Sequence, residues 1–273
     1  MKQYAMIINL ERCVGCHACA VACRAEWQIP TREGYRRNWV RRLGPAMTSH
    51  GMSHTFYPGL CNHCDSPACI PVCPADRVEK TFTDPSGKTK TMEVAATWKD
   101  PFNGTVQIDQ KRCLGCGACR DACPYGARYV NTQVANEDID GEGIADKCTF
   151  CMPRVEKGLA PACVQTCITD ARIFGFLDDP GSEVAAYVKK GARRLESANV
   201  KIGPNVYYYG KPRDLELLAK TSTPQVMPEV SSRRRMLAAI MQPAVRQVRT
   251  AGLLGLAGAL AVQGLAEDGE KEE

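Results

Sequence analysis

Hydrophobic residues occur in short runs that stand directly before cysteine-rich segments. The stretches "MIINLERCVGC" (residues 6–16) and "VQIDQKRCLGC" (residues 106–116) share a short apolar run, a nearby acidic residue and a basic residue before the first cysteine. This internal repeat predicts the same unit twice: a short β-strand, a cysteine loop and then a helix, around residues 19–27 and 119–129.

Polar, turn-rich segments separate the cysteine groups. Residues 32–59 and 80–104 are rich in turn-forming residues, so we expect surface loops or hairpins that either grip a partner protein or are plain decoration. Farther along, a helix capped by Ser182 is predicted within residues 181–195, although Gly191 weakens its end. A short strand in "NVYYYG" and a linker in "TSTPQVMPEVSS" follow.

Cysteine is the unusual residue in an otherwise ordinary globular composition, with 16 among 273 residues. The N-terminal stretch "MKQYAMIINLERC" shows no secretory signal, so we expect a reducing compartment, where cysteines are more often ligands or catalysts than disulfides. Export of the folded chain with a partner that carries its own signal stays open. The cysteines form four groups of four with none left over: Cys13, Cys16, Cys19, Cys23; Cys61, Cys64, Cys69, Cys73; Cys113, Cys116, Cys119, Cys123; and Cys148, Cys151, Cys163, Cys167.

The spacing within these groups predicts iron–sulfur clusters. Groups one and three read C-x2-C-x2-C-x3-C, the run that ligates [4Fe–4S] clusters in bacterial ferredoxins. Three close cysteines wrap one cluster, small residues such as Gly15 and Gly115 let the backbone approach, and the fourth cysteine serves the neighbouring cluster. Groups two and three end in Cys-Pro as in the full ferredoxin run, whereas Arg24 and Ile168 follow the last cysteine of groups one and four. We therefore expect four [4Fe–4S] clusters.

Three other uses of the cysteines explain less of the pattern. A c-type haem on the C-x-x-C-H run ending at His17 would leave Cys19 and Cys23 without a role, and group three has Gly117 in place of the histidine. Zinc favours two separated pairs of thiolates, which only group four, C-x2-C-x11-C-x3-C, resembles. Disulfides need opposed Cβ vectors and an oxidising compartment.

Clusters would change the charge of the chain. Each oxidised cubane with its thiolates carries about −2, so four of them would turn the formal +5 into roughly −3. Basic residues beside the ligands either raise the reduction potentials of the clusters or are simply solvated. They are Arg12, Arg24, Lys111, Arg112, Arg120, Lys147 and Arg154.

No motif for substrate chemistry occurs: G-x-G-x-x-G, the P-loop, G-x-S-x-G and H-E-x-x-H are all missing. The four histidines (His17, His50, His54 and His63) form no triad pattern, and His17 and His63 stand inside cysteine loops, where they either tune a potential or fill the loop. We assign no catalytic residue and do not expect an enzyme in the chain on its own.

An uncharged segment, residues 250–266, follows several arginines and precedes an acidic tail. Its 17 residues are at the lower limit for a membrane span, and Ala251, Gly255 and Ala259 would share one helical face. We expect membrane contact here. The alternative is a glycine-rich helix that is buried or lies against a soluble partner.

The pairing of the four groups is open from spacing alone. Chain order would pair group one with two and three with four, whereas a nested arrangement would pair two with three and one with four.

With these cysteine groups, the chain resembles the four-cluster electron-transfer subunits of complex iron–sulfur molybdoenzymes. Members of this family serve DMSO, polysulfide, thiosulfate and arsenate reductases and formate dehydrogenase. The resemblance covers about residues 1–210 and is specific to the family, not to one member. It lies in all 16 cysteines and in the stretches "YPGLCNHCDSPACIPVCP", "DKCTFC", "ARIFGFLDDPGSEV" and "PNVYYYG".

The resemblance implies the nested pairing. Cys13, Cys16 and Cys19 would bind one cluster with Cys167; Cys148, Cys151 and Cys163 another with Cys23; Cys61, Cys64 and Cys69 a third with Cys123; and Cys113, Cys116 and Cys119 the fourth with Cys73. The expected fold is α+β, with two ferredoxin-like modules, one nested in the other, each binding two [4Fe–4S] clusters. The expected divisions are 1–56 (outer module, first half), 57–135 (inner module), 136–180 (outer module, second half), 181–220 (C-terminal extension) and 221–273 (linker and possible membrane-contacting tail).

The implied function is conduction of single electrons between a molybdopterin (Mo or W) catalytic subunit and a quinone-reactive integral membrane subunit. The complex would be associated with the cytoplasmic membrane, on a face that the sequence leaves open, with no nucleic acid as partner. One alternative is a polyferredoxin subunit of a hydrogenase or another soluble redox complex, and a second is a structural zinc protein that binds protein or nucleic acid.

Overall fold

Strand β1 (Tyr4–Asn9) is an inner strand of the main sheet and is buried on both faces. The computed structural model describes residues 2–133 and 143–242. Within β1, the residues from Ala5 to Ile8 are all 0% exposed, which is why the run is apolar at every position and does not alternate. β1 pairs antiparallel with β10 (Arg172–Phe176) and parallel with β12 (Val206–Tyr209), which pairs with β11 (Arg193–Arg194). The strand order is β10-β1-β12-β11.

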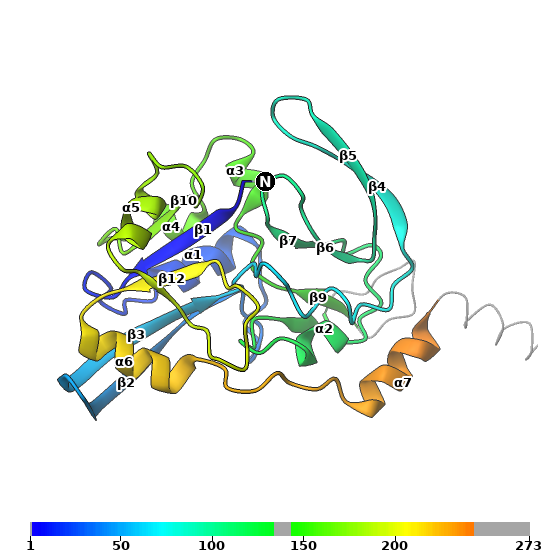
Figure 1. Cartoon of the computed structure of the whole chain (residues 1–273). Coiled ribbons are helices and arrows are strands. Elements are labelled where there is room, and N and C mark those ends of the chain that lie inside the picture. Colours follow the sequence, from blue (N-terminus) through cyan, green and yellow to red (C-terminus); the bar gives the residue numbers. More distant parts are fainter. Residues whose placement is uncertain (1, 134–142, 243–273) are drawn as a thin grey trace, which may run out of the picture.

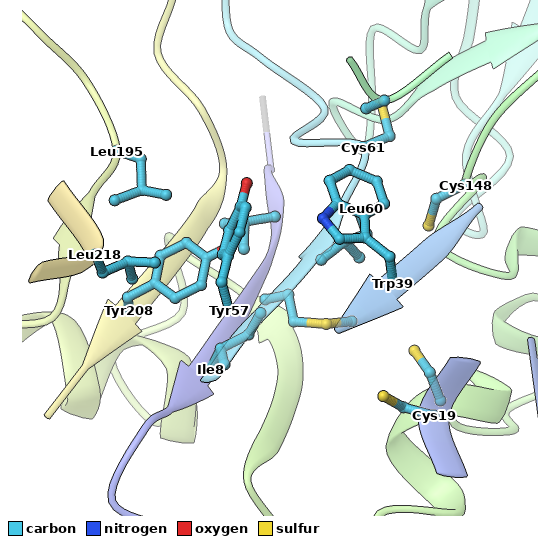
Figure 2. Packing of buried hydrophobic residues seen from close by; sticks show 14 of the residues in the cluster. Ile8, Cys19, Trp39, Tyr57, Leu60, Cys61, Cys148, Leu195, Tyr208 and Leu218 are labelled. Atoms are coloured by element: carbon cyan, nitrogen blue, oxygen red, sulfur yellow. The ribbon is translucent and has the colours of Figure 1, made fainter. Parts of the chain in front are cut away.

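Each face of this sheet has its own core. Helix α5 (Glu183–Lys189) covers one face, where Val184 and Tyr187 pack against Ile7 (Figure 1). On the other face, Tyr208 and its neighbours pack with a β-hairpin and with helix α6 (Pro212–Ser222). Figure 2 shows this second core, with Tyr208 and Leu218 at one end and the thiols of Cys19, Cys61 and Cys148 toward the other. The hydrophobic core therefore runs directly into the region that contains the cysteines.

The two long polar insertions form hairpins, which confirms one of the two forms expected for them. The first hairpin is β2 (Asn38–Thr48) with β3 (Gly51–Leu60), and the second is β4 (Val78–Thr83) with β5 (Thr89–Val94). The second hairpin projects from the body of the molecule (Figure 1). Two further antiparallel pairs join short strands near the cysteine loops: β6 (Thr97–Lys99) with β7 (Val106–Ile108), and β8 (Tyr129–Asn131) with β9 (Ile144–Asp146).

Of the two helices predicted after cysteine loops, one has the predicted length and the other is shorter. Helix α1 (Ala18–Glu26) matches the prediction for residues 19–27. The prediction for residues 119–129 was wrong, because α2 (Ala118–Asp121) has a single turn. Pro124 disfavours helical backbone at the residue before it, and Gly126 has a φ of +59°, so the chain turns toward β8 instead. The helices of the fourth cysteine group are equally short: α3 (Met152–Val155) and α4 (Ala162–Gln165).

Three C-terminal predictions are confirmed, and one helix was not predicted. The Ser182 hydroxyl accepts a hydrogen bond from the Ala185 N–H (3.0 Å) and caps α5, and "VYYY" forms β12. The predicted linker at residues 221–232 is non-helical from residue 223 to residue 231, and a helix that was not predicted, α7 (Ser232–Met241), follows it. In the described ranges, no helix combines the length and the apolar character needed to cross a bilayer. The apolar segment 250–266 lies outside the described residues.

Candidate metal centres

One cavity is formed where the loop after β1 meets the turn before β10. The register pairs Ile8 with Arg172, so the loop that β1 enters and the turn from which β10 emerges lie at the same edge of the sheet. The Asn9 N–H donates to the Ala171 carbonyl (2.8 Å) and closes this edge. Four cysteines line the cavity and define quartet A: Cys13, Cys16, Cys19 and Cys167.

A second cavity lies beside β7 and the chain that leads to β8. Val106 and the buried side chain of Arg128 are part of its wall. Its four cysteines define quartet C: Cys61, Cys64, Cys69 and Cys123. In both cavities, three cysteines of one sequence group meet the last cysteine of another group.

The remaining eight cysteines are neighbours in two further sets. Burial raises the pKa of the Cys23 thiol, and the adjacent thiols of Cys163 and Cys151 raise it further. The pKa of Cys148 is raised by burial and then by Cys23 and the other two thiols. These residues define quartet B: Cys23, Cys148, Cys151 and Cys163.

The last set is centred on the third cysteine group. Burial raises the pKa of Cys116 to about 11, against the effect of a hydrogen bond from the Ala118 N–H, and neighbouring thiols raise it further. The contributing thiols and Cys116 define quartet D: Cys73, Cys113, Cys116 and Cys119. Within residues 2–133 and 143–242, no three His, Cys, Asp or Glu side chains lie close enough together to hold one single metal ion.

The quartets follow one another in the order A, B, C, D. Cys19 of quartet A and Cys163 of quartet B pack in one core cluster, which also contains the neighbouring thiols of Cys148 (quartet B) and Cys61 (quartet C). In a separate cluster, Cys69 of quartet C packs with cysteines of quartet D. Cys16, in quartet A, is exposed, so this end of the row reaches the surface of the protein.

Two glycines allow chain segments to approach the cysteine loops closely. Gly15 has a φ of +68°, and an added Cβ would lie 2.3 Å from a ring carbon of Phe56. Gly115 has a φ of +65°, and an added Cβ would lie 2.2 Å from the carbonyl oxygen of Gly143. Both positions therefore require glycine, as the sequence predicted, and the close neighbours are other segments of the chain.

Main-chain N–H groups donate to several sulfur atoms. The N–H groups of Phe150, Ala145 and Ala171 each lie 3.3 Å from a cysteine Sγ. Burial would raise the pKa of Cys167, but N–H donors at Thr169 and Ala171 outweigh it and the pKa is lowered. Elsewhere burial dominates, as at Cys69, where it raises the pKa to about 11. A bound metal removes the proton from such thiols, because metal ions bind the thiolate form.

Three cations are buried among the thiols without a carboxylate partner. Arg128 and Arg172 are each 4% exposed, and Lys147 is 0% exposed. Within the described part of the chain, no carboxylate forms an ion pair with any of the three. A buried cation is costly unless an anion lies near it, and here the nearby groups able to become anions are thiols. The donor set and this excess of buried positive charge both fit anionic iron–sulfur clusters held by thiolates.

Most of the basic residues singled out in the sequence are exposed or half-buried, and two of them, Arg24 and Arg112, donate to main-chain carbonyl oxygens. Lys147 is the exception, since it is fully buried. Arg154 pairs with Glu26 (2.9 Å) and Arg120 with Asp121 (2.8 Å). The sequence analysis missed Arg128 and Arg172. A signal was present, because "CPYGAR" and "CITDAR" both place Ala-Arg four and five residues after the last cysteine of a group.

His63 fills the space between two cysteine loops, which is one of the two roles considered for it. Its ring is fully buried and stacks on Phe150 with centroids 3.8 Å apart, joining the loop of Cys61 to that of Cys148. Its Nδ1 accepts a hydrogen bond from the Val106 N–H (2.9 Å), and burial lowers its pKa well below the usual value. It is therefore a neutral packing residue in this environment.

Helix α7 covers the loop of quartet D, a contact that the sequence did not predict. Arg234 donates from Nη1 to the Cys116 carbonyl oxygen (3.0 Å) and lies 3.5 Å from Asp121. Ala238 packs against Cys116. The available signal was Ser231, whose hydroxyl caps the helix by accepting from the Arg234 N–H (3.3 Å).

A buried ion pair joins the two chain segments that supply quartet B. Arg37 and Asp146 are connected by two short contacts, Nη2 to Oδ1 at 2.7 Å and Nε to Oδ2 at 2.8 Å, and Tyr129 also donates to Asp146. The guanidinium lies 4.1 Å from the ring centroid of Trp27, whose Nε1 is 3.4 Å from the Cys151 sulfur. The pair thus ties the loop after α1 to β9, which leads to Cys148.

Comparison with known proteins finds a matching family model and several similar subunits of reductases. A family model described as a 4Fe-4S dicluster domain matches residues 52–177. A tetrathionate reductase subunit of Salmonella typhimurium is 38% identical over 213 residues, which is 76% of this chain and 72% of that protein. The thiosulfate reductase electron transfer subunit PhsB of Salmonella typhi is 38% identical over 189 residues (68% and 82%). The arsenate respiratory reductase iron-sulfur subunit ArrB of a Shewanella strain is 30% identical over 244 residues (74% and 94%).

The substitution Asp146→Asn tests the buried ion pair. It leaves the Arg37 cation buried beside a neutral amide, and we expect a loss of about 3–5 kcal/mol of stability. Glu26→Gln is the matched control, because it makes the same change in a pair whose side chains are 20% and 30% exposed, where about 1 kcal/mol or less is expected. The measurement is the thermal unfolding midpoint of anaerobically purified protein, and equal effects of the two substitutions would contradict this assignment.

Proposed function

The chain belongs to the family of iron–sulfur electron-transfer subunits of complex iron–sulfur molybdoenzymes, and on that premise we propose that it conducts single electrons through four [4Fe–4S] clusters. One observation carries this proposal: the first three cysteines of each group lie beside the last cysteine of a different group, as in the ferredoxin mode of cluster binding. Quartets A, B, C and D would each hold one cluster.

The nested module arrangement is part of the proposal. Quartets A and B combine cysteine groups one and four, whereas quartets C and D combine groups two and three. The pairing of β1 with β10, residues about 165 positions apart, supports an outer module (1–56 and 136–180) that encloses the sequence of an inner module (57–135). Residues 181–220 would extend the outer module, since β12 adds to its sheet.

The clusters supply one-electron redox chemistry, and the protein supplies position and environment. The thiolates would hold the irons, the main-chain N–H donors and buried cations would stabilise negative charge, and the cores around the quartets would exclude water. The order of the quartets supports a single route for the electron, which would pass from each cluster to the next in the row.

We propose a molybdopterin-type catalytic subunit as the partner at quartet A. Cys16 is exposed there, and three large apolar side chains beside these cysteines are exposed as well: Val14 (55%), Val21 (66%) and Ile168 (72%). An apolar surface around an exposed redox group suits a protein interface that excludes water. A quinone-reactive membrane subunit would exchange electrons at the other end of the row, near quartet D, in a complex associated with the cytoplasmic membrane.

Metal analysis tests the proposed cofactors. Anaerobically purified full-length protein should contain about sixteen iron atoms and a similar amount of acid-labile sulfide per chain, with a brown absorbance that dithionite bleaches. About four zinc atoms in a colourless folded protein would refute the proposal.

Serine substitutions test the pairing of the cysteine groups. Cys163→Ser and Cys167→Ser are only four residues apart, yet they should alter different clusters. Cys167→Ser should change the same electron paramagnetic resonance signal as Cys13→Ser, and Cys163→Ser the same signal as Cys23→Ser. If Cys167→Ser instead altered the signal changed by Cys113→Ser, groups three and four would be paired in chain order and the nested arrangement would be wrong.

Ile168→Glu tests the docking surface at quartet A. A charge placed in the apolar rim should reduce the amount of catalytic subunit that copurifies from the native host by about tenfold, while the iron content stays at the wild-type level. Val226→Glu is the control, since Val226 is 76% exposed, stands in the segment before α7 and does not line the quartet A cavity. Undiminished copurification with Ile168→Glu would place the interface elsewhere.

A further inference from the structure

The three cations buried among the thiols occupy the three junctions of the row of quartets. We infer that Arg172, Lys147 and Arg128 are positioning residues for electron transfer, each raising the reduction potentials of the two clusters on either side of it. This inference rests on the proposed function, because it requires a cluster in every quartet.

Arg172 lies at the junction of quartets A and B. Its side chain is part of the wall of the quartet A cavity, and its Nη1 lies 3.8 Å from the sulfur of Cys163 in quartet B. Nη2 donates to Oδ1 of Asn38 (2.9 Å), which fixes the plane of the guanidinium. Asn38 in turn donates to the Cys19 carbonyl oxygen (3.0 Å), so the cation is held by the segment that forms quartet A.

Lys147 lies at the junction of quartets B and C. Its ammonium group donates to the carbonyl oxygen of Cys148 in quartet B (2.7 Å) and to that of Val106. Val106 is part of the wall of the quartet C cavity. Carbonyl oxygens are neutral acceptors, so they orient the cation without cancelling its charge. Burial and the neighbouring Arg128 disfavour its charged form, whereas thiols of both quartets favour it: Cys61 and Cys69 of quartet C and Cys148 of quartet B.

Arg128 lies at the junction of quartets C and D. It lines the quartet C cavity, and its Nη2 donates to the hydroxyl of Thr97 (3.0 Å). Its Nη1 is buried and has no hydrogen-bond partner among the described residues, although such a group is normally paired. Cys69 of quartet C and Cys119 of quartet D pack in one buried cluster, and both thiols favour the charged form of Arg128. The orphaned donor and the two-sided surroundings are the pattern expected of a cation between two anionic groups.

The physical consequence is symmetric stabilisation of the travelling electron. Reduction adds one negative charge to a cluster, and a nearby cation favours that state. A cation at a junction favours the electron on either neighbour, so it raises both potentials together. A cation attached to one cluster alone would instead create a step that traps the electron. Burial keeps the interaction strong, because exposed charges are screened by water and salt.

Methionine substitutions at the three positions provide the test. The full-length variants Arg172→Met, Lys147→Met and Arg128→Met are purified anaerobically, and the four midpoint potentials are measured by electron paramagnetic resonance titration. The serine variants above identify which signal belongs to which quartet. We expect each methionine variant to lower two potentials, each by at least a tenfold change in the one-electron equilibrium constant, about 59 mV.

The pairs of affected clusters must overlap in a fixed way. Arg172→Met should affect A and B, Lys147→Met should affect B and C, and Arg128→Met should affect C and D. Lys157→Met and Arg12→Met are the matched controls: both residues are exposed and lie in the sequence beside cysteine groups, and no potential should change. The charge-retaining variants Arg172→Lys and Arg128→Lys should keep all four equilibrium constants within about threefold of wild type.

Several results would overturn the inference. These are unchanged potentials in the methionine variants, an equal shift of all four clusters, a comparable shift in either control, or a tenfold fall in a charge-retaining variant. If a methionine variant fails to fold, the lysine variant at the same arginine still tests the inference, because a tenfold fall in a one-electron equilibrium constant in that variant would contradict it. Failure of the proposed function is distinguishable, since wild-type protein would then lack four clusters, whereas failure of this inference alone leaves four clusters whose potentials do not shift in the expected pairs.

Discussion

The attraction between buried cations and cysteine sulfur is the interaction on which the rest of the structure depends. The interior contains Arg128, Lys147 and Arg172 beside sixteen cysteines, most of them buried, and no carboxylate of the described residues pairs with these cations. Charges taken out of water are tolerated only where opposite charge and hydrogen bonds replace the solvent. In the proposed function, thiolates bound to iron would supply that opposite charge. The buried cations and the cysteine thiolates would thus compensate each other's charge.

The main sheet explains how cysteines far apart in the sequence meet. β1 and β10 are antiparallel neighbours, so the end of one lies beside the start of the other, and quartet A forms at that edge. Arg172 is the first residue of β10, which is why it lies between this edge and Cys163. The same logic applies in the inner part of the chain, where Arg128 immediately precedes β8 and its side chain faces quartet C. Strand termini, fixed by ladder hydrogen bonds, therefore position both the ligands and their cations.

Local features of this molecule were predictable from sequence, and long-range ones were not. The strand before Cys13, the helix after it, the two hairpins and the Ser182 cap each depend on a few adjacent residues, and all were confirmed. The meeting of cysteine groups one and four depends on the pairing of β1 with β10, which no local spacing encodes. Helix α2 was overestimated because the effect of Pro124 on the preceding turn was not weighed. Helix α7 was missed because its packing against the loop of Cys116 is a tertiary contact.

The same electrostatics couple folding to cofactor loading. Without metal, burial keeps thiols such as Cys69 and Cys163 protonated at neutral pH, since it raises their pKa to about 11. Neutral thiols cannot balance three buried cations, and burial accordingly lowers the pKa of Lys147. Iron binding converts the thiols to thiolates and supplies the missing negative charge in one step. Bound clusters would therefore stabilise the compact arrangement of the quartets, because they would supply negative charge beside the interior cations.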